Sequence, residues 1–190
     1  MAEVDHLTRL AHRARTGDEG ALDAFVDGTY EQVRRFCTSL VDEQSADDLA
    51  QETFVRAVRA LARFRGDASA RTWLLAIARH VCLDELRARS RRRRDGEKLL
   101  GTPGVPSVAD ASQESVVADL LGRVEPDRRI AFVLTQVLGL SYDDAARTCG
   151  CPTGTIRSRV ARARADLIKL LGHRPQIPSA RVDDLCDTGT

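Results

Sequence analysis

The sequence predicts an all-α protein made of two small helical domains joined by a flexible linker. Apolar residues recur at intervals of three and four along almost every patterned segment, which is the spacing of an amphipathic helix. Strand-like alternation of apolar and polar residues is absent from the sequence. A stretch rich in glycine, proline and serine at residues 95–113 separates the two helical parts and predicts the linker.

The charge distribution predicts two contacts with polyanions on a chain that also presents an acidic surface. The net charge of the 190 residues is only +1. The basic residues, however, concentrate in two blocks, residues 61–98 and 153–174, and acidic stretches precede and separate these blocks. Paired basic blocks of this kind favour nucleic acid as the partner.

Several functional classes are disfavoured by what the sequence lacks. It contains no apolar run long enough to span a membrane and no secretory signal pattern, so we expect a cytoplasmic protein without membrane insertion. The five cysteines include no Cys-x-x-Cys pair, which argues against a disulfide framework. Catalytic and metal-binding motifs are also missing, so we expect no catalytic residue, no metal and no cofactor.

The first domain, residues 1–94, is expected to contain three main helices. The first follows the apolar stripe between Leu22 and Val41. Ser45 and Asp48 form a capping box that opens the second, whose inward face would carry Phe54, Val58 and Leu61. A loop at residues 63–69 precedes the third helix, which begins near Trp73 and ends in the arginine run at residues 91–94.

The second domain, residues 114–172, ends in a predicted helix-turn-helix, and a polar tail follows at residues 173–190. Pro126 suits the start of an earlier helix and Gly139 its end. Ser141 and Asp144 form a second capping box, which opens a short helix that stops at Gly150. Pro152 then fits the first turn of a long final helix.

The start of that final helix suits contact with duplex DNA. Small hydroxylated residues allow the helix N-terminus to approach a phosphate, and the arginines that follow can reach base edges. The alternative is a helical hairpin with a solvated basic face, and we favour DNA binding over it. The candidate duplex-binding residues are Thr153, Thr155, Arg157, Ser158, Arg159, Arg162 and Arg164.

Two other segments allow more than one interpretation. The acidic helix at residues 45–54 taken by itself is better explained as a solvated face. The segment at residues 63–94 places Phe64 and Trp73 among arginines, a combination that can stack on unpaired bases. Both aromatic residues could instead belong to the core, and for Trp73 we favour that alternative. Cys149 and Cys151 flank Gly150, and we expect them to pack rather than to bind metal or sense oxidants.

Four segments together resemble the extracytoplasmic-function (ECF) sigma factors of bacteria, members of the sigma-70 superfamily. They are DDLAQETF at residues 47–54, RFRGDASARTWLLAIAR at 63–79, GLSY at 139–142 and GCPTGTIRSR at 150–159. Each motif is moderately specific, but four in the same order and at matching separations are highly specific. The resemblance covers about residues 20–172, nearly all of the expected folded part.

The resemblance implies that the two domains are sigma region 2 and sigma region 4 of a non-enzymatic RNA polymerase subunit that directs promoter recognition, DNA melting and transcription initiation. Residues of the acidic motif would bind core RNA polymerase at the clamp of the largest subunit: Asp48, Leu49, Gln51, Glu52 and Phe54. A second set would hold the −10 non-template strand: Arg63, Phe64, Arg65, Gly66, Ser69, Arg71, Arg79, His80 and Arg87. The duplex-binding residues named above would read the −35 element, and an anti-sigma factor is a further implied partner.

Two residues depart from the family pattern near the expected −10 reader. His80 stands where the family often has asparagine, and Ala70 where a larger residue is common. The −10 preferences of relatives therefore do not transfer to this chain. Two rival functions remain at this point. A repressor or activator with a helix-turn-helix would leave the acidic motif without a role, and a nucleic-acid enzyme would need a carboxylate or histidine metal cluster.

Overall fold

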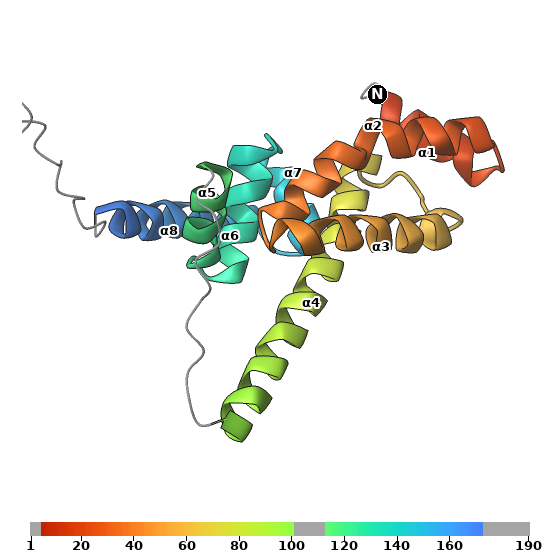
Figure 1. Ribbon diagram of the computed structural model, residues 1–190. Coiled ribbons are helices and arrows are strands. Elements are labelled where there is room, and N and C mark those ends of the chain that lie inside the picture. The colour runs from red at the N-terminus through yellow and green to blue at the C-terminus, as the bar shows by residue number, and fades with distance from the viewer. Residues whose placement is uncertain (1–4, 101–112, 173–190) are drawn as a thin grey trace, which may run out of the picture.

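The computed structural model describes residues 5–100 and 113–172, and within these ranges the regular structure is entirely helical (Figure 1). An N-terminal unit of four helices is followed by a C-terminal unit of four, which confirms the predicted fold class. The N-terminal unit contains α1 (His6–Arg15), α2 (Glu19–Thr38), α3 (Glu43–Leu61) and α4 (Ala70–Leu100). The C-terminal unit contains α5 (Gln113–Gly122), α6 (Pro126–Phe132) with the π-helical turn η1 (Val133–Val137), α7 (Tyr142–Cys149) and α8 (Thr153–Gly172).

Helix α1 is an element that the sequence analysis missed. Asp5 caps it by accepting a hydrogen bond of 2.9 Å from the backbone nitrogen of Thr8, and Leu10 and Ala11 are buried. The helix is only ten residues long and its few apolar positions stand among histidines and arginines. Leu7, Leu10, Ala11 and Ala14 nevertheless recur at the spacing of an amphipathic helix, so the signal for α1 was present in the sequence and was overlooked.

Two expectations for α3 need correction. The helix begins at Glu43 rather than at Ser45, because the Asp42 carboxylate accepts from the Ser45 backbone nitrogen at 3.0 Å and takes the N-cap position. Val58 was expected to face inward, but 47% of it is exposed, and Val55 beside it is exposed as well. Phe54 and Leu61 face the core as predicted.

Helix α4 is longer than expected. It continues through Leu100, so residues 95–100, assigned above to the linker, are helical. A single interior glycine such as Gly96 costs a helix about 1 kcal/mol, whereas the residues that follow it, Glu97, Lys98, Leu99 and Leu100, are all good helix formers. The remaining expected linker residues, 101–112, and the polar tail, 173–190, lie outside the described residues.

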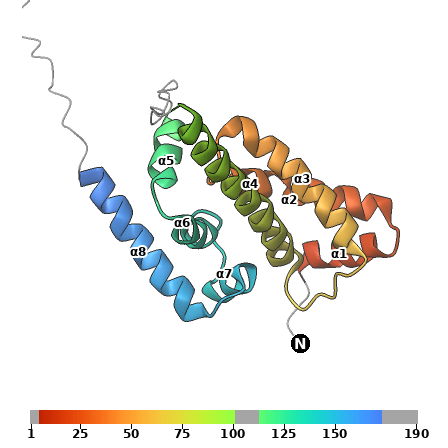
Figure 2. The ribbon, with the colours of Figure 1, turned by 90° about the horizontal axis from the view of Figure 1, so that it is seen from below.

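The two helical units pack against each other along α4, which lies between α3 on one side and α6 and α7 on the other (Figure 2). One continuous apolar cluster includes Phe36 and Leu74 from the N-terminal unit and Leu134 and Ile156 from the C-terminal unit. The two domains therefore share one continuous apolar core in this structure.

The predicted helix-turn-helix is confirmed in its local chemistry. The Ser141 hydroxyl accepts a hydrogen bond of 3.0 Å from the Asp144 nitrogen and caps α7. Gly150 ends α7 in the left-handed conformation, with φ of +64°, where glycine carries no steric penalty. The turn between α7 and α8 depends on that glycine.

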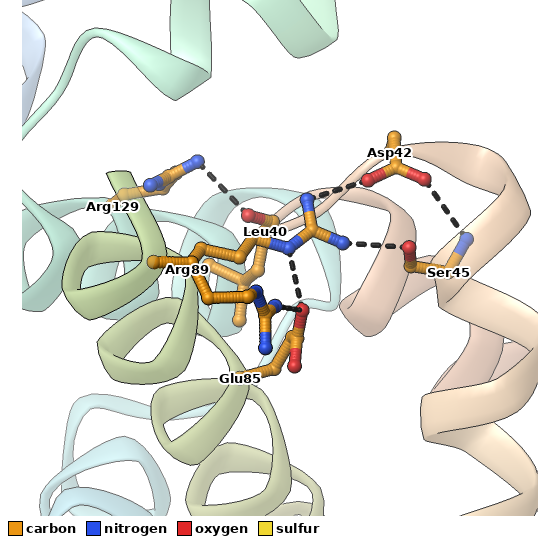
Figure 3. Close-up of polar contacts among 7 residues, drawn as sticks. Leu40, Asp42, Ser45, Glu85, Arg89 and Arg129 are labelled. Atoms are coloured by element: carbon orange, nitrogen blue, oxygen red, sulfur yellow. Dashed lines mark hydrogen bonds and ion pairs between the residues drawn. The ribbon is translucent and has the colours of Figure 1, made fainter. Parts of the chain in front are cut away.

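A polar cluster ties the start of α3 to the exposed part of α4 (Figure 3). The Arg89 guanidinium donates to the Asp42 carboxylate at 2.5 Å, to the Ser45 hydroxyl at 2.6 Å and to the Glu85 carboxylate at 2.7 Å. Burial raises the pKa of Asp42, but the hydrogen bonds from Arg89 and Ser45 outweigh it and hold that pKa at about 2, against 3.8 ordinarily.

This cluster predicts how stability depends on acid. Because the pKa of Asp42 is lower in the folded state than in the unfolded state, its stabilisation is present above about pH 4 and is lost as the pH falls towards 2. Asp42→Asn keeps a capping side chain but removes the charge. We expect it to cost about 0.5–1 kcal/mol at pH 7, since the side chain is half exposed, and progressively less as the pH falls through 2. Urea unfolding at several pH values measures this, and an equal cost at pH 7 and pH 2 would contradict it.

Candidate functional site

The acidic face of α3 presents most of the residues expected to bind a protein partner. Asp48 and Gln51 are exposed, Leu49 is half-buried, and Glu52 is partly exposed while it accepts a hydrogen bond of 2.7 Å from Arg56. Phe54 does not reach this surface. It is 9% exposed, and its ring stacks on Tyr30 with a centroid separation of 6.0 Å.

Two exposed valines extend the acidic face. Val55 and Val58 are 43% and 47% exposed, and they lie one and two turns further along α3 than Gln51. The surface therefore combines carboxylates with apolar groups. Val58 was expected in the core because its spacing from Phe54 and Leu61 fits a helical apolar stripe.

The loop between α3 and α4 presents positive charge around a glycine. Arg63, Arg65 and Gly66 are exposed, and Gly66 has a φ of +80°. Ser69 serves as a helix cap, because its hydroxyl accepts from the Thr72 nitrogen at 3.1 Å. The loop therefore carries two exposed arginines, and the Ser69 side chain helps to fix its backbone at the start of α4.

Phe64, expected among the DNA-binding residues, lies in the core. It is only 3% exposed, and its ring packs between His12 at 5.1 Å and Trp73 at 5.0 Å, measured between ring centroids. No face of this ring is open to a base in this conformation. The alternative considered for Phe64 and Trp73, that both belong to the core, is the one that the packing supports.

Two of the expected −10 residues on α4 face the C-terminal unit. Arg71 donates a hydrogen bond of 2.5 Å to the Leu138 carbonyl, and Arg79, whose side chain is 14% exposed, makes an ion pair of 3.8 Å with Asp127. A third contact between the units is a hydrogen bond of 3.5 Å, which the Thr148 hydroxyl donates to the Thr72 carbonyl oxygen. DNA cannot reach Arg71 or Arg79 while these contacts hold.

The other two α4 residues of that set are accessible. His80 is exposed, with its Nδ1 atom 2.7 Å from the Ala76 carbonyl oxygen. Arg87 is exposed and makes an ion pair of 3.5 Å with Asp84 on the same helix. The structure therefore divides the predicted −10 residues into an exposed group and a covered group.

Helix α8 presents most of the predicted duplex-binding residues to solvent. Arg157, Ser158, Arg162 and Arg164 are exposed. The Thr153 hydroxyl donates to the Asp143 carboxylate at 2.8 Å, which ties the first turn of α8 to α7, and Thr155 is half-buried. The exposed positions lie along one helix that follows directly after the glycine turn.

Arg159 points away from that row. It donates to the Asp127 carboxylate and lies 3.8 Å from the Cys151 sulfur. Asp127 therefore holds an arginine from each unit, Arg79 and Arg159, and it is a residue that the sequence analysis did not single out. Nothing in the local pattern of residues 126–132 reveals such a contact, because both partners are distant in the sequence.

The two cysteines beside the turn differ in their surroundings. Cys149 is buried, and burial raises its pKa to about 11, so the thiol is neutral at physiological pH. Within the described ranges, no group of three or more histidine, cysteine, aspartate or glutamate residues could hold a metal ion. Burial supports the packing interpretation for Cys149, whereas Cys151 is partly exposed and its sulfur accepts a hydrogen bond from Arg159.

Comparisons with known proteins agree with this geometry. The sequence-family model for Sigma-70 region 2 matches residues 25–92, and the family model for Sigma-70, region 4 matches residues 115–167. The ECF RNA polymerase sigma factor SigC of Mycobacterium tuberculosis is 49% identical over 173 residues, which cover 88% of this chain and 92% of SigC. The RNA polymerase sigma-H factor of Pseudomonas aeruginosa is 34% identical over 178 residues, covering 86% of this chain and 92% of the relative.

Solved structures show the same arrangement of helices. CnrH in complex with the cytosolic domain of CnrY aligns with a TM-score of 0.72 at 28% identity, over 90% of this chain and all of CnrH. The sigma factor RpoE of Bartonella quintana, in complex with the anti-sigma factor NepR, aligns with a TM-score of 0.66 at 30% identity, over 80% of this chain and 98% of RpoE.

The fold and its exposed cations define a promoter-recognising protein with two DNA-binding regions. The chain belongs to the ECF sigma factors of the sigma-70 superfamily, and it directs transcription initiation by RNA polymerase. A repressor with a helix-turn-helix would not account for the match over residues 25–92. No helix in the described part of the chain is long and apolar enough to cross a membrane.

Proposed function

We propose that three separate surfaces of this sigma factor divide the tasks of polymerase binding, −10 strand capture and −35 duplex reading. The observation that supports this division is the separation of charge. The exposed face of α3 carries carboxylates, whereas the loop before α4 and the start of α8 carry exposed arginines. Each surface then meets a partner of matching chemistry.

The acidic face of α3 binds the clamp of the largest polymerase subunit in this proposal. Asp48, Gln51 and Glu52 supply polar and charged contacts, and Leu49 with the exposed Val55 and Val58 supplies apolar area that water would otherwise cover. Interfaces of this kind combine a desolvated apolar centre with a complementary charged rim. Phe54 acts from beneath by fixing α3 against α2.

The loop at residues 62–69 captures an unpaired base of the −10 non-template strand. Arg63 and Arg65 neutralise the phosphate backbone of the strand, and the exposed side of the loop at Gly66 contacts the base. Binding energy for the extruded base offsets the few kcal/mol that unpairing costs, so opening needs no nucleotide hydrolysis by this chain. Arg71 and Arg79 join this surface only after the two units separate.

The exposed residues of α8 read the −35 element as duplex, with phosphate contacts fixing register and arginines reading bases. The chain acts in the cytoplasm as a non-enzymatic subunit. Its partners include an anti-sigma factor, since RpoE of Bartonella quintana, at 30% identity, is described in complex with one.

Charge reversal on α3 tests the polymerase surface. The double variant Asp48→Arg, Glu52→Arg replaces attraction by repulsion and is expected to weaken binding to core polymerase at least about 10-fold. It removes only one exposed ion pair, with Arg56, so helicity should be unchanged. Fluorescence titration with core polymerase measures the affinity.

The matched control for this prediction is Asp23→Arg, Asp27→Arg, which reverses two exposed carboxylates with the same spacing on α2. It should bind core polymerase like the parent. If the α3 and α2 variants lose affinity equally, net charge rather than the α3 surface governs association, and the assignment is wrong.

Base preference tests the −35 surface. Arg157→Ala should lower affinity by about 1–3 kcal/mol and relax the preference at one −35 position, as expected for a bidentate contact with guanine. Arg123→Ala removes an exposed arginine of the same unit, which is paired only with Asp119. It should leave the preference intact. Selection from a randomised −35 library by holoenzyme reports both, and an unchanged profile for Arg157→Ala would refute its role.

A further inference from the structure

One face of α1 contacts the loop at residues 62–69 and the start of α4. Thr8, His12 and Arg15 are spaced by four and three residues, which places them on the same side of the helix. None of the surfaces assigned above uses α1. Its contacts fall at Phe64, Gly66 and Ala70, which are near the beginning, in the middle and at the end of the loop.

The contact at the end of the loop is a buried hydrogen bond. The Ala70 nitrogen donates to the Thr8 hydroxyl oxygen at 2.8 Å, across 62 residues of sequence. The Thr8 hydroxyl donates its own proton to the Asp5 carboxylate at 2.7 Å. Its oxygen is therefore oriented to accept the hydrogen bond from Ala70. Since Ala70 opens α4, its nitrogen has no partner within that helix, and Thr8 supplies one.

The contacts at the beginning of the loop hold Phe64. Arg15 donates a hydrogen bond of 3.0 Å to the Phe64 carbonyl oxygen. The His12 ring lies against the Phe64 ring, with centroids 5.1 Å apart and a tilt of 45°. Helix α1 therefore fixes both the backbone and the side chain of Phe64.

The contact in the middle involves the glycine. A Cβ atom on Gly66 would lie 2.7 Å from His12 Nε2, so the loop backbone passes directly against the histidine ring. Gly66 also has a φ of +80°, which disfavours any other residue. The turn at Gly66 is thus shaped by α1 as well as by its own backbone preference.

We infer that α1 positions the −10 capture loop, with Thr8, His12 and Arg15 as positioning residues that hold it in its base-binding form. Arg65, Gly66 and Asp67 are exposed between the anchored points, Phe64 and Ala70. A loop fixed in advance loses less conformational entropy when it binds a base, so it captures the base more tightly and discriminates better. The inference rests on the proposed role of this loop.

The test uses holoenzyme reconstituted from the full chain and core polymerase. The probe is a fluorescent fork-junction DNA whose unpaired −10 strand comes from a promoter that the parent holoenzyme selects out of a random library. Arg15→Ala and Thr8→Val should each weaken capture of this strand by about 3- to 10-fold, the effect of losing one hydrogen bond. Both should also flatten base preference at −10, while affinity for −35 duplex and for core polymerase is unchanged.

Two further variants act as controls. Thr8→Ser keeps the hydroxyl and should restore capture to the parental level. Arg13→Ala removes an arginine from the same helix whose side chain bonds to Asp18 rather than to the loop, and it should behave like the parent. A loss with Arg13→Ala as large as with Arg15→Ala would overturn the inference, as would an equal loss of −10 capture and −35 binding.

Arg65→Ala separates failure of this inference from failure of the proposed function. If it weakens −10 capture while Arg15→Ala and Thr8→Val do not, the loop reads the −10 strand without help from α1, and only the inference is wrong. If none of the three variants changes capture, the loop does not bind the −10 strand, and both are wrong.

Discussion

Helix α4 packs against both halves of the chain, and the accessibility of the candidate DNA-binding residues follows from this. On one side it contacts α1, α2 and α3, and on the other it contacts α7 (Figure 2). Arg71 and Arg79 lie on the side that the C-terminal unit covers. Arg71 and Arg79 cannot contact DNA and the C-terminal unit at the same time. Their binding to DNA therefore requires that the contact between the two units opens.

The contact between the units carries an energetic cost. Arg129 on α6 is 6% exposed and donates to the Leu40 carbonyl at 3.2 Å, across the boundary between the units. Its Nε atom, and that of Arg79, are buried without a hydrogen-bond partner among the described residues. An unpaired buried polar atom costs about 1–3 kcal/mol, which reduces the stability that apolar burial gives to this contact.

Local sequence chemistry was sufficient to predict much of the fold. Ser141, Gly150 and Pro126 mark helix boundaries through capping and backbone preferences that act within a few residues, and the structure agrees at each. The family motifs identified the class of protein. The apolar stripe of α1 has helical spacing and was overlooked, whereas Val58 was misplaced because an exposed valine at a helical interval looks like a core residue.

The candidate sites were predicted less completely than the fold, since their corrections depend on contacts between distant segments. Phe64 is covered by His12, and Arg159 is held by Asp127. The spacing of residues along the chain does not encode which of two arginines on a helix will find a carboxylate on another helix. The same limit applies to the Thr8–Ala70 hydrogen bond, which only the folded arrangement reveals.

The most direct test of the packing on α4 is energy transfer between dyes at Arg35 on α2 and Ile168 on α8, both of which are exposed and belong to none of the proposed binding surfaces. The account predicts efficient transfer in the free chain and clearly lower transfer in holoenzyme bound to a promoter, where the −10 and −35 elements hold the two units apart. Equally low transfer in the free chain and in the promoter complex would contradict the two-sided packing of α4.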